Sequence, residues 1–122
     1  MALASTTTEN DALNSIDNSA TPTNKAAYVS LHTATPGTTG ASENAATGGY
    51  ARQACTWNAA SGGSKTNSTS LTFSTAGTTA VTYFGTFSAV TAGTYGIGGA
   101  LASGITAASI TIAAGALSLS AS

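Results

Sequence analysis

Charge is the scarcest property of this 122-residue sequence. Only 6% of its residues are charged, and three basic residues stand against four acidic ones. An ordinary soluble domain is about a quarter charged. So few cations exclude the basic surface that nucleic acid or an anionic membrane requires. A weakly charged surface favours a chain packed within an assembly, although a hydroxyl-coated extracellular domain has the same composition.

Cysteine and histidine are nearly absent as well. The single cysteine, Cys55, excludes an internal disulfide framework and a multi-cysteine zinc site, and its apolar neighbours are typical of a small buried hydrophobe. The single histidine, His32, lacks the partners of a catalytic triad, and the sequence has no G-x-S-x-G motif. We therefore expect no enzyme, metal or cofactor site, and we expect His32 to face solvent or a neighbouring subunit.

Long apolar stretches are missing. No stretch approaches the roughly 18 apolar residues that a membrane-spanning helix needs. The first ten residues, MALASTTTEN, lack the basic and apolar regions of a signal peptide. We therefore expect synthesis in the cytoplasm and no membrane partner.

A helix is the first element that the sequence does predict. Thr6 and Glu9 have the spacing of a capping box, and Leu13 and Ile16 follow at helical spacing. Such a short helix with so thin an apolar stripe is marginal alone. We therefore expect an N-terminal arm over residues 1–24, with Leu13 and Ile16 anchoring it to a neighbouring subunit.

From residue 25 onward the apolar period falls to two, as in half-buried strands. Val29 and Leu31 alternate with polar residues in YVSLH, Leu71 and Phe73 do so in LTFS, and Ile110 and Ile112 do so in SITI. The segment YARQACTWN also predicts a strand, and SGGSKTNS after it predicts a connection. The segment AVTYFGTFSAV places these residues on one predicted face: Val81, Tyr83, Gly85 and Phe87. Six or seven such strands predict an all-β fold over 25–122, an antiparallel β-sandwich of the jelly-roll or immunoglobulin-like type.

The stretch from Ala34 to Gly49 is rich in Thr, Gly, Ala and Ser and predicts a long loop. Because charges are so few, Arg52 is expected to pair with Glu43 and to tie this loop back onto the sheet. Trp57, in an alternating segment, is expected in the core rather than on a stacking platform for sugars. The residues that we expect to structure the loop are His32, Pro36, Glu43, Arg52 and Trp57.

The stretch YVSLHTATPGTTGASEN, with GGYARQACTWNAASGGS after it, resembles a family of small virion structural proteins of tailed phages, especially those of actinobacteria. The resemblance covers nearly the whole chain and is most specific from Tyr28 to Ser64. Members commonly carry an acidic residue at the position of Thr35 and frequently a histidine at that of Tyr83. This chain is therefore less charged than its family.

The resemblance implies a non-enzymatic protein of the virion, of the tail fibre or minor tail type, without a cofactor. A capsid decoration protein is one alternative, because the chain is small and has no second domain. An alternative of another class is a carbohydrate-binding module for the host surface. The expected partners are other virion proteins and further copies of the chain in a homo-oligomer, with a host-surface glycan as a third candidate.

Overall fold

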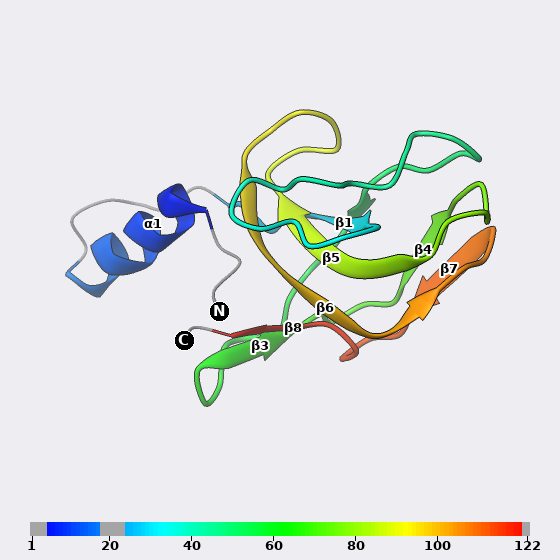
Figure 1. Cartoon of the computed structure of the whole chain (residues 1–122). Coiled ribbons are helices and arrows are strands. Elements are labelled where there is room, and N and C mark those ends of the chain that lie inside the picture. Colours follow the sequence, from blue (N-terminus) through cyan, green and yellow to red (C-terminus); the bar gives the residue numbers. More distant parts are fainter. Residues whose placement is uncertain (1–4, 18–23, 121–122) are drawn as a thin grey trace.

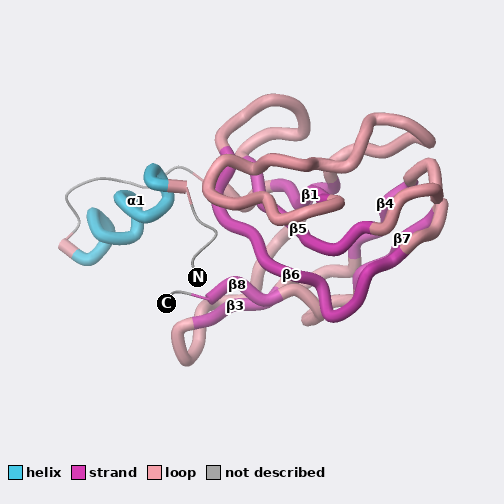
Figure 2. The backbone as a smooth tube through the Cα atoms, in the orientation of Figure 1, coloured by secondary structure: helices cyan, strands magenta, loops and turns pink. Residues whose placement is uncertain are grey.

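A computed structural model describes residues 5–17 and 24–120 as one short helix followed by eight strands (Figure 1, Figure 2). Residues 1–4 and 18–23 of the predicted arm lie outside these ranges. In chain order the elements are α1 (Thr6–Ile16), β1 (Tyr28–His32), β2 (Gln53–Ala54), β3 (Ser64–Thr66), β4 (Leu71–Ser74), β5 (Val81–Phe87), β6 (Tyr95–Ile105), β7 (Ser109–Ile112) and β8 (Ser118–Ser120).

The strands form three antiparallel sheets around one apolar core. The largest sheet has the order β2-β1-β5-β6, and the two smaller sheets pair β3 with β8 and β4 with β7. The all-β antiparallel fold with a short N-terminal helix is thus confirmed. A jelly-roll or immunoglobulin-like sandwich stays a prediction. The buried core residues are Val29, Leu31, Cys55, Leu71, Phe73, Val81, Phe84, Ile110, Ile112 and Leu117.

β1 is buried on both faces, not half-buried as the alternation predicts. Val29 and Leu31 belong to the core, and Ser30 and His32 on the opposite face are equally inaccessible, at 0% exposure. The long loop predicted from 34 to 49 folds back over this second face, where Ala41 contacts the His32 ring. His32 therefore faces neither solvent nor a neighbouring subunit, because the loop covers it.

β5 departs from the predicted alternation at its start. Its register against β6 shifts between Val81 and Tyr83, where β6 carries extra residues. Such a bulge bends a strand and redirects its side chains. Val81 and Phe84 lie in the core, whereas Phe87 lies on the other face, with its ring stacked 6.4 Å from that of His32. The prediction that Val81 shares a face with Phe87 is therefore wrong.

The segment around Cys55 contains less strand than the sequence predicts. Only β2 forms there, while the predicted connection SGGSKTNS contains β3. Cys55 is buried, and its burial raises the pKa of the thiol. Trp57 packs against the core, as predicted, and its indole N–H donates to the carbonyl of Ala26 over 2.8 Å.

Candidate functional site

α1 starts one residue earlier than the capping-box spacing predicts. The N-cap is Ser5, not Thr6, and the Ser5 hydroxyl accepts the backbone N–H of Thr8 over 3.2 Å. The same hydroxyl donates to the carbonyl of Tyr95 over 2.9 Å, and the Thr8 hydroxyl donates to that of Gly96 over 3.1 Å. The start of α1 is thereby fastened to the start of β6.

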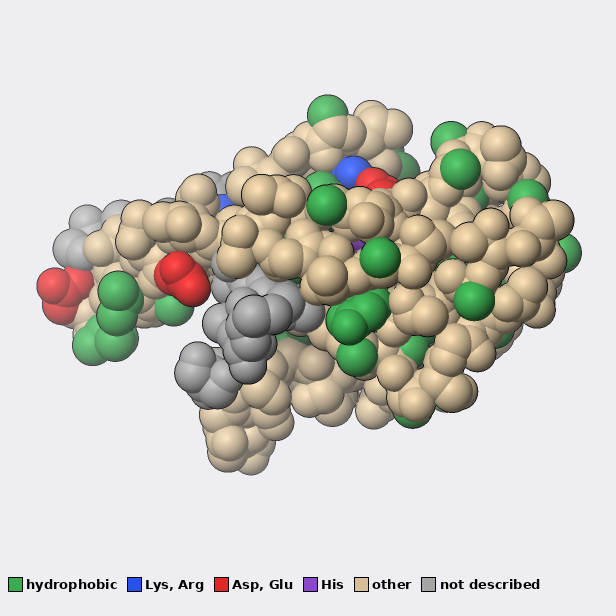
Figure 3. Space-filling view, viewed as in Figure 1, with side chains coloured by type: hydrophobic (Ala, Val, Ile, Leu, Met, Phe, Trp, Pro, Cys, Tyr) green, Lys and Arg blue, Asp and Glu red, His purple; other side chains and the backbone are tan. Residues whose placement is uncertain are grey.

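The rest of α1 is exposed to solvent rather than buried. An ion pair between Asp11 and Lys25 joins the helix to the segment before β1. None of the helix residues is buried, and Leu13 and Ile16 are 65% and 80% exposed. Figure 3 shows hydrophobic side chains standing out at this end of the molecule. This exposed apolar pair is the first candidate functional surface.

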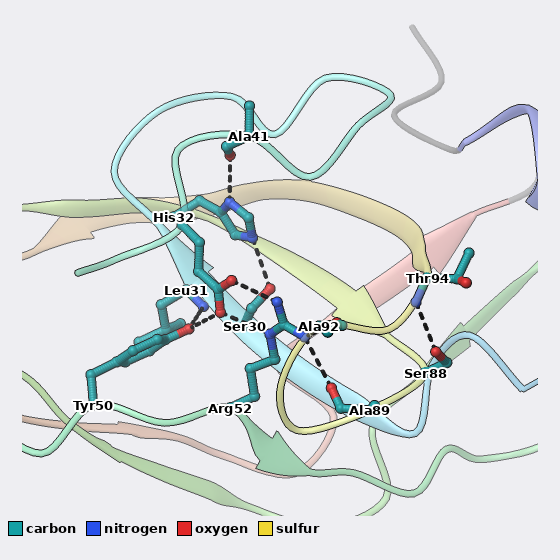
Figure 4. Close-up of polar contacts among 11 residues, drawn as sticks. Ser30, Leu31, His32, Ala41, Tyr50, Arg52, Ser88, Ala89, Ala92 and Thr94 are labelled. Atoms are coloured by element: carbon teal, nitrogen blue, oxygen red, sulfur yellow. Dashed lines mark hydrogen bonds and ion pairs between the residues drawn. The ribbon is translucent and has the colours of Figure 1, made fainter. Parts of the chain in front are cut away.

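A second candidate is the polar cluster formed by Ser30, His32, Glu43, Tyr50 and Arg52. Figure 4 labels Ser30, His32, Tyr50 and Arg52 of this cluster. Arg52 is its hub. Its Nε and Nη2 donate to the two carboxylate oxygens of Glu43 over 2.9 and 2.8 Å, which is the ion pair that the sequence predicts. Its Nη1 donates to the carbonyls of Ala89 and Ala92 over 3.0 and 2.7 Å. One guanidinium therefore joins the long loop to the turn between β5 and β6.

Tyr50 and Glu43 complete this junction. The Tyr50 hydroxyl donates to Glu43 Oε2 over 2.9 Å and accepts the backbone N–H of Leu31 over 2.9 Å. Burial alone would raise the pKa of Glu43, but the hydrogen bonds from Arg52 and Tyr50 outweigh it and hold that pKa below its ordinary value. Glu43 is therefore the ionised partner around which the loop is organised.

His32 bonds on both sides of its ring. Nδ1 lies 2.7 Å from the carbonyl of Ala41, which can only accept, so Nδ1 carries the hydrogen. Nε2 of the neutral ring then accepts the Ser30 hydroxyl over 2.7 Å. Burial lowers the pKa of His32, although the bond to Ala41 opposes the shift. This serine and histidine are within hydrogen-bonding distance, but both are fully buried, so no substrate reaches them.

The aromatic rings of Phe87 and Tyr95 pack against the cluster. The Arg52 guanidinium stands 3.5 Å above the Phe87 ring, and Phe87 meets Tyr95 edge to face. Gly85 provides the space for this packing. A Cβ at Gly85 would lie 2.8 Å from His32 Nε2 and 3.0 Å from the Ser30 hydroxyl oxygen, closer than van der Waals contact allows. The cluster thus depends on a residue without a side chain.

Comparison with family models identifies the chain's relatives. Residues 3–120 match the family described as podophage GP4 fiber I protein gp80. The chain belongs to this family. No curated protein matches it. The chain is therefore a phage tail fibre component and part of the virion, which confirms the tail fibre interpretation in preference to capsid decoration. As a fibre protein it associates with other virion proteins.

The structure of this fibre protein unites some of the predicted loop residues and separates others. It brings His32, Glu43 and Arg52 into one cluster. It also buries Pro36 of the loop against β6, where a Cβ at Gly98 would lie 3.0 Å from the proline ring. Trp57 lies apart, against the core. Sequence reasoning missed Ser30 and Tyr50. The spacing of Ser30 and His32, two residues apart in a strand, was the available signal, because such residues share a face.

The described ranges contain no group of three or more His, Cys, Asp or Glu side chains placed to hold a metal ion. Within the same ranges, no helix has the length and apolar character that crossing a bilayer would require. Two features of the fibre protein are candidates for a functional role. They are the exposed apolar pair on α1 and the loop surface that the polar cluster supports.

Proposed function

We propose that this chain is a non-enzymatic fibre subunit that attaches to a neighbouring virion subunit through Leu13 and Ile16. The exposure of these two side chains, on a helix that buries none of its residues, is the observation that carries the proposal. Full burial of a leucine or isoleucine contributes about 1.5–3 kcal/mol. In this view residues 1–24 form the attaching arm and 25–122 the structural body.

The neighbour in this proposal is a further copy of the chain, so the assembled form is a homo-oligomer. The weakly charged surface supports it, because little electrostatic repulsion opposes the packing of copies. The inaccessibility of Ser30 and His32 supports a subunit without catalytic activity. An origin in a phage of actinobacteria, suggested by the sequence resemblance, is part of the same proposal.

The proposal includes no nucleic acid or membrane partner. Lys25 and Arg52 are committed to ion pairs, and Lys65 is the only other basic residue in the sequence. One remaining cation is far short of the basic patch by which nucleic acid or an anionic lipid surface is bound.

Replacement of both apolar residues in the phage tests the attachment. The double variant Leu13→Asp with Ile16→Asp should be absent from purified particles, as measured by quantitative mass spectrometry. Ser15→Asp is the matched control, because it adds a carboxylate at another exposed position of α1. The purified double variant should unfold at nearly the same temperature as the unmodified chain, since exposed positions contribute little to stability. Normal incorporation of the double variant would refute the proposal.

A host-surface glycan is a second candidate partner, but Trp57, Tyr50 and Tyr95 are already engaged within the fold. Trp57 is half-buried with its N–H bonded, and the Tyr50 hydroxyl both donates and accepts. Tyr95 is buried, and its burial raises the pKa of its hydroxyl to about 12. A surface depression lined in part by Glu43 supports a glycan partner instead.

A further inference from the structure

We propose that a surface depression between residues 43–52 and 89–92 binds a neutral saccharide. The inference rests on the proposed function, because a fibre subunit presents this surface on the particle. The depression lies where the long loop meets the turn between β5 and β6. Its lining residues are Glu43, Asn44, Ala46, Tyr50, Ala51, Arg52, Val90, Thr91 and Ala92.

Both walls of the depression are held in place before any ligand arrives. The Arg52 guanidinium bonds the Glu43 carboxylate on one wall and the carbonyls of Ala89 and Ala92 on the other (Figure 4). Ala92 adopts a left-handed backbone conformation, with φ of 52°, which few residues other than glycine accept without strain. A preorganised site of this kind loses little entropy when it binds.

The turn that forms the second wall is closed at its base. The Ser88 hydroxyl accepts the backbone N–H of Thr94 over 2.8 Å, and the Ser88 N–H donates to the Thr94 carbonyl over 3.1 Å. Gly93 has φ of 75°, and a Cβ there would lie 2.8 Å from the Ser88 hydroxyl oxygen. The wall is therefore a compact turn with its own internal bonds.

Two polar residues of the lining, Glu43 and Asn44, retain unused hydrogen-bonding capacity. Within the described part of the chain, Glu43 Oε1 accepts one hydrogen bond, from Arg52 Nη2, and so keeps a free lone pair. The Asn44 side chain donates one amide hydrogen to the Ala45 carbonyl over 3.0 Å and keeps its other hydrogen. An acceptor and a donor in one lining suit the hydroxyls of a sugar, each of which both donates and accepts.

Apolar side chains form much of the remaining lining, and the charges of Glu43 and Arg52 cancel. Val90 is 45% exposed, and three alanines share the lining with it. This combination suits the C–H face of a sugar ring, since ligand sites are mostly apolar with a few oriented polar groups. Arg52 is already neutralised by Glu43, so the site offers no excess positive charge to an anion. A neutral saccharide is therefore favoured over an acidic one.

Titration of the ¹⁵N-labelled full chain with sugars tests the site by NMR. The probes are the methyl glycosides of galactose, glucose and mannose, with galacturonate as the acidic comparator. At least one methyl glycoside should give saturable shifts confined to amides of 43–46, 50–52 and 89–93, with a dissociation constant on the order of 1 mM. Galacturonate should bind more weakly than the neutral glycosides.

Asn44→Ala should weaken that binding about tenfold, the loss expected for one hydrogen bond. It should leave the fold intact, because the backbone N–H of Asn44 still donates to the Leu31 carbonyl over 2.8 Å. Asn58→Ala, an exposed asparagine outside the depression, is the control and should bind normally.

Absence of saturable shifts with every methyl glycoside, shifts elsewhere, or tighter binding of galacturonate would overturn the site. So would unchanged affinity in Asn44→Ala. None of these results touches the incorporation experiment on Leu13 and Ile16. A chain that binds no sugar but still requires these residues for incorporation refutes only the saccharide site.

Discussion

Gly85 shows at the scale of one residue how tightly the covered face of the large sheet is packed. Gly85→Ala would drive a methyl group against His32 Nε2 and the Ser30 hydroxyl. We expect a loss of about 1–3 kcal/mol in the free energy of unfolding, the usual cost of overpacking. Urea denaturation followed by Trp57 fluorescence measures it.

The control for this substitution is Gly104→Ala. A Cβ there meets Thr82 Cγ2 at an ordinary 3.4 Å, and the position is exposed. The variant should keep its stability or gain up to about 1 kcal/mol, because alanine restricts the unfolded chain. Equal losses in the two variants would show that the packing against His32 is not the cause.

His32 makes the stability of the chain depend on pH. The folded chain keeps the ring neutral, because burial lowers the pKa below its ordinary value of 6.5. The unfolded chain binds a proton as the pH falls through that value and the folded chain does not, so stability is lost from there downward. Glu43 adds a second loss at lower pH. Its pKa in the folded chain lies below 4.5, so its contribution disappears as the pH falls through that lowered pKa.

His32→Asn tests the first of these losses. The variant removes the titrating ring, so its unfolding free energy should change less than that of the unmodified chain between neutral pH and roughly pH 5. Urea midpoints over this range give the two slopes, and Glu43 is present in both proteins. Identical slopes would mean that His32 does not titrate on unfolding. Lower stability at every pH is expected from lost packing and does not affect this comparison.

At the scale of elements, the attachment of α1 to β6 depends on a few hydroxyl groups. Ser5→Ala removes both the N-cap and the bond to the Tyr95 carbonyl. We expect the helix to lose about 1 kcal/mol of local stability, which faster amide hydrogen exchange in α1 would report. Exchange in β5 should stay unchanged.

Ser15→Ala is the matched control for the cap. Ser15 bonds only within the helix, to the Ala12 carbonyl over 2.7 Å, and is exposed. Its replacement should not speed exchange in α1. Equal acceleration in both variants would mean that the helix responds to any loss of a hydroxyl and that the contact with β6 is unimportant.

The elements also show what local sequence pattern predicts and what it does not. Alternation located β1, β4, β5 and β7, because a half-exposed strand sorts its side chains by face. It gave no sign of β3, whose residues Ser64–Thr66 read as a polar connection and form a strand by pairing with β8. It also placed the start of α1 one residue late, since two adjacent hydroxyl residues have similar capping ability.

Contacts between distant parts of the molecule explain why only part of the candidate site was predicted from the sequence. Scarcity of charge was enough to pair Glu43 with Arg52, since few other partners exist for either side chain. The burial of His32 depends on the long loop folding over β1, and no local pattern encodes that. The contribution of Tyr50 and of the carbonyls of Ala89 and Ala92 likewise depends on contacts between segments distant in the sequence.

The two internal ion pairs have a consequence for how this molecule finds its neighbours. Asp11 with Lys25 and Glu43 with Arg52 account for four of the seven charged side chains, so little net field extends into solvent. Electrostatic steering, which can raise association rates a hundredfold or more, is then unavailable. Encounters proceed at the speed of unguided diffusion and stay nearly indifferent to ionic strength. The rate at which this protein assembles into the virion then depends on local concentration, not on long-range attraction.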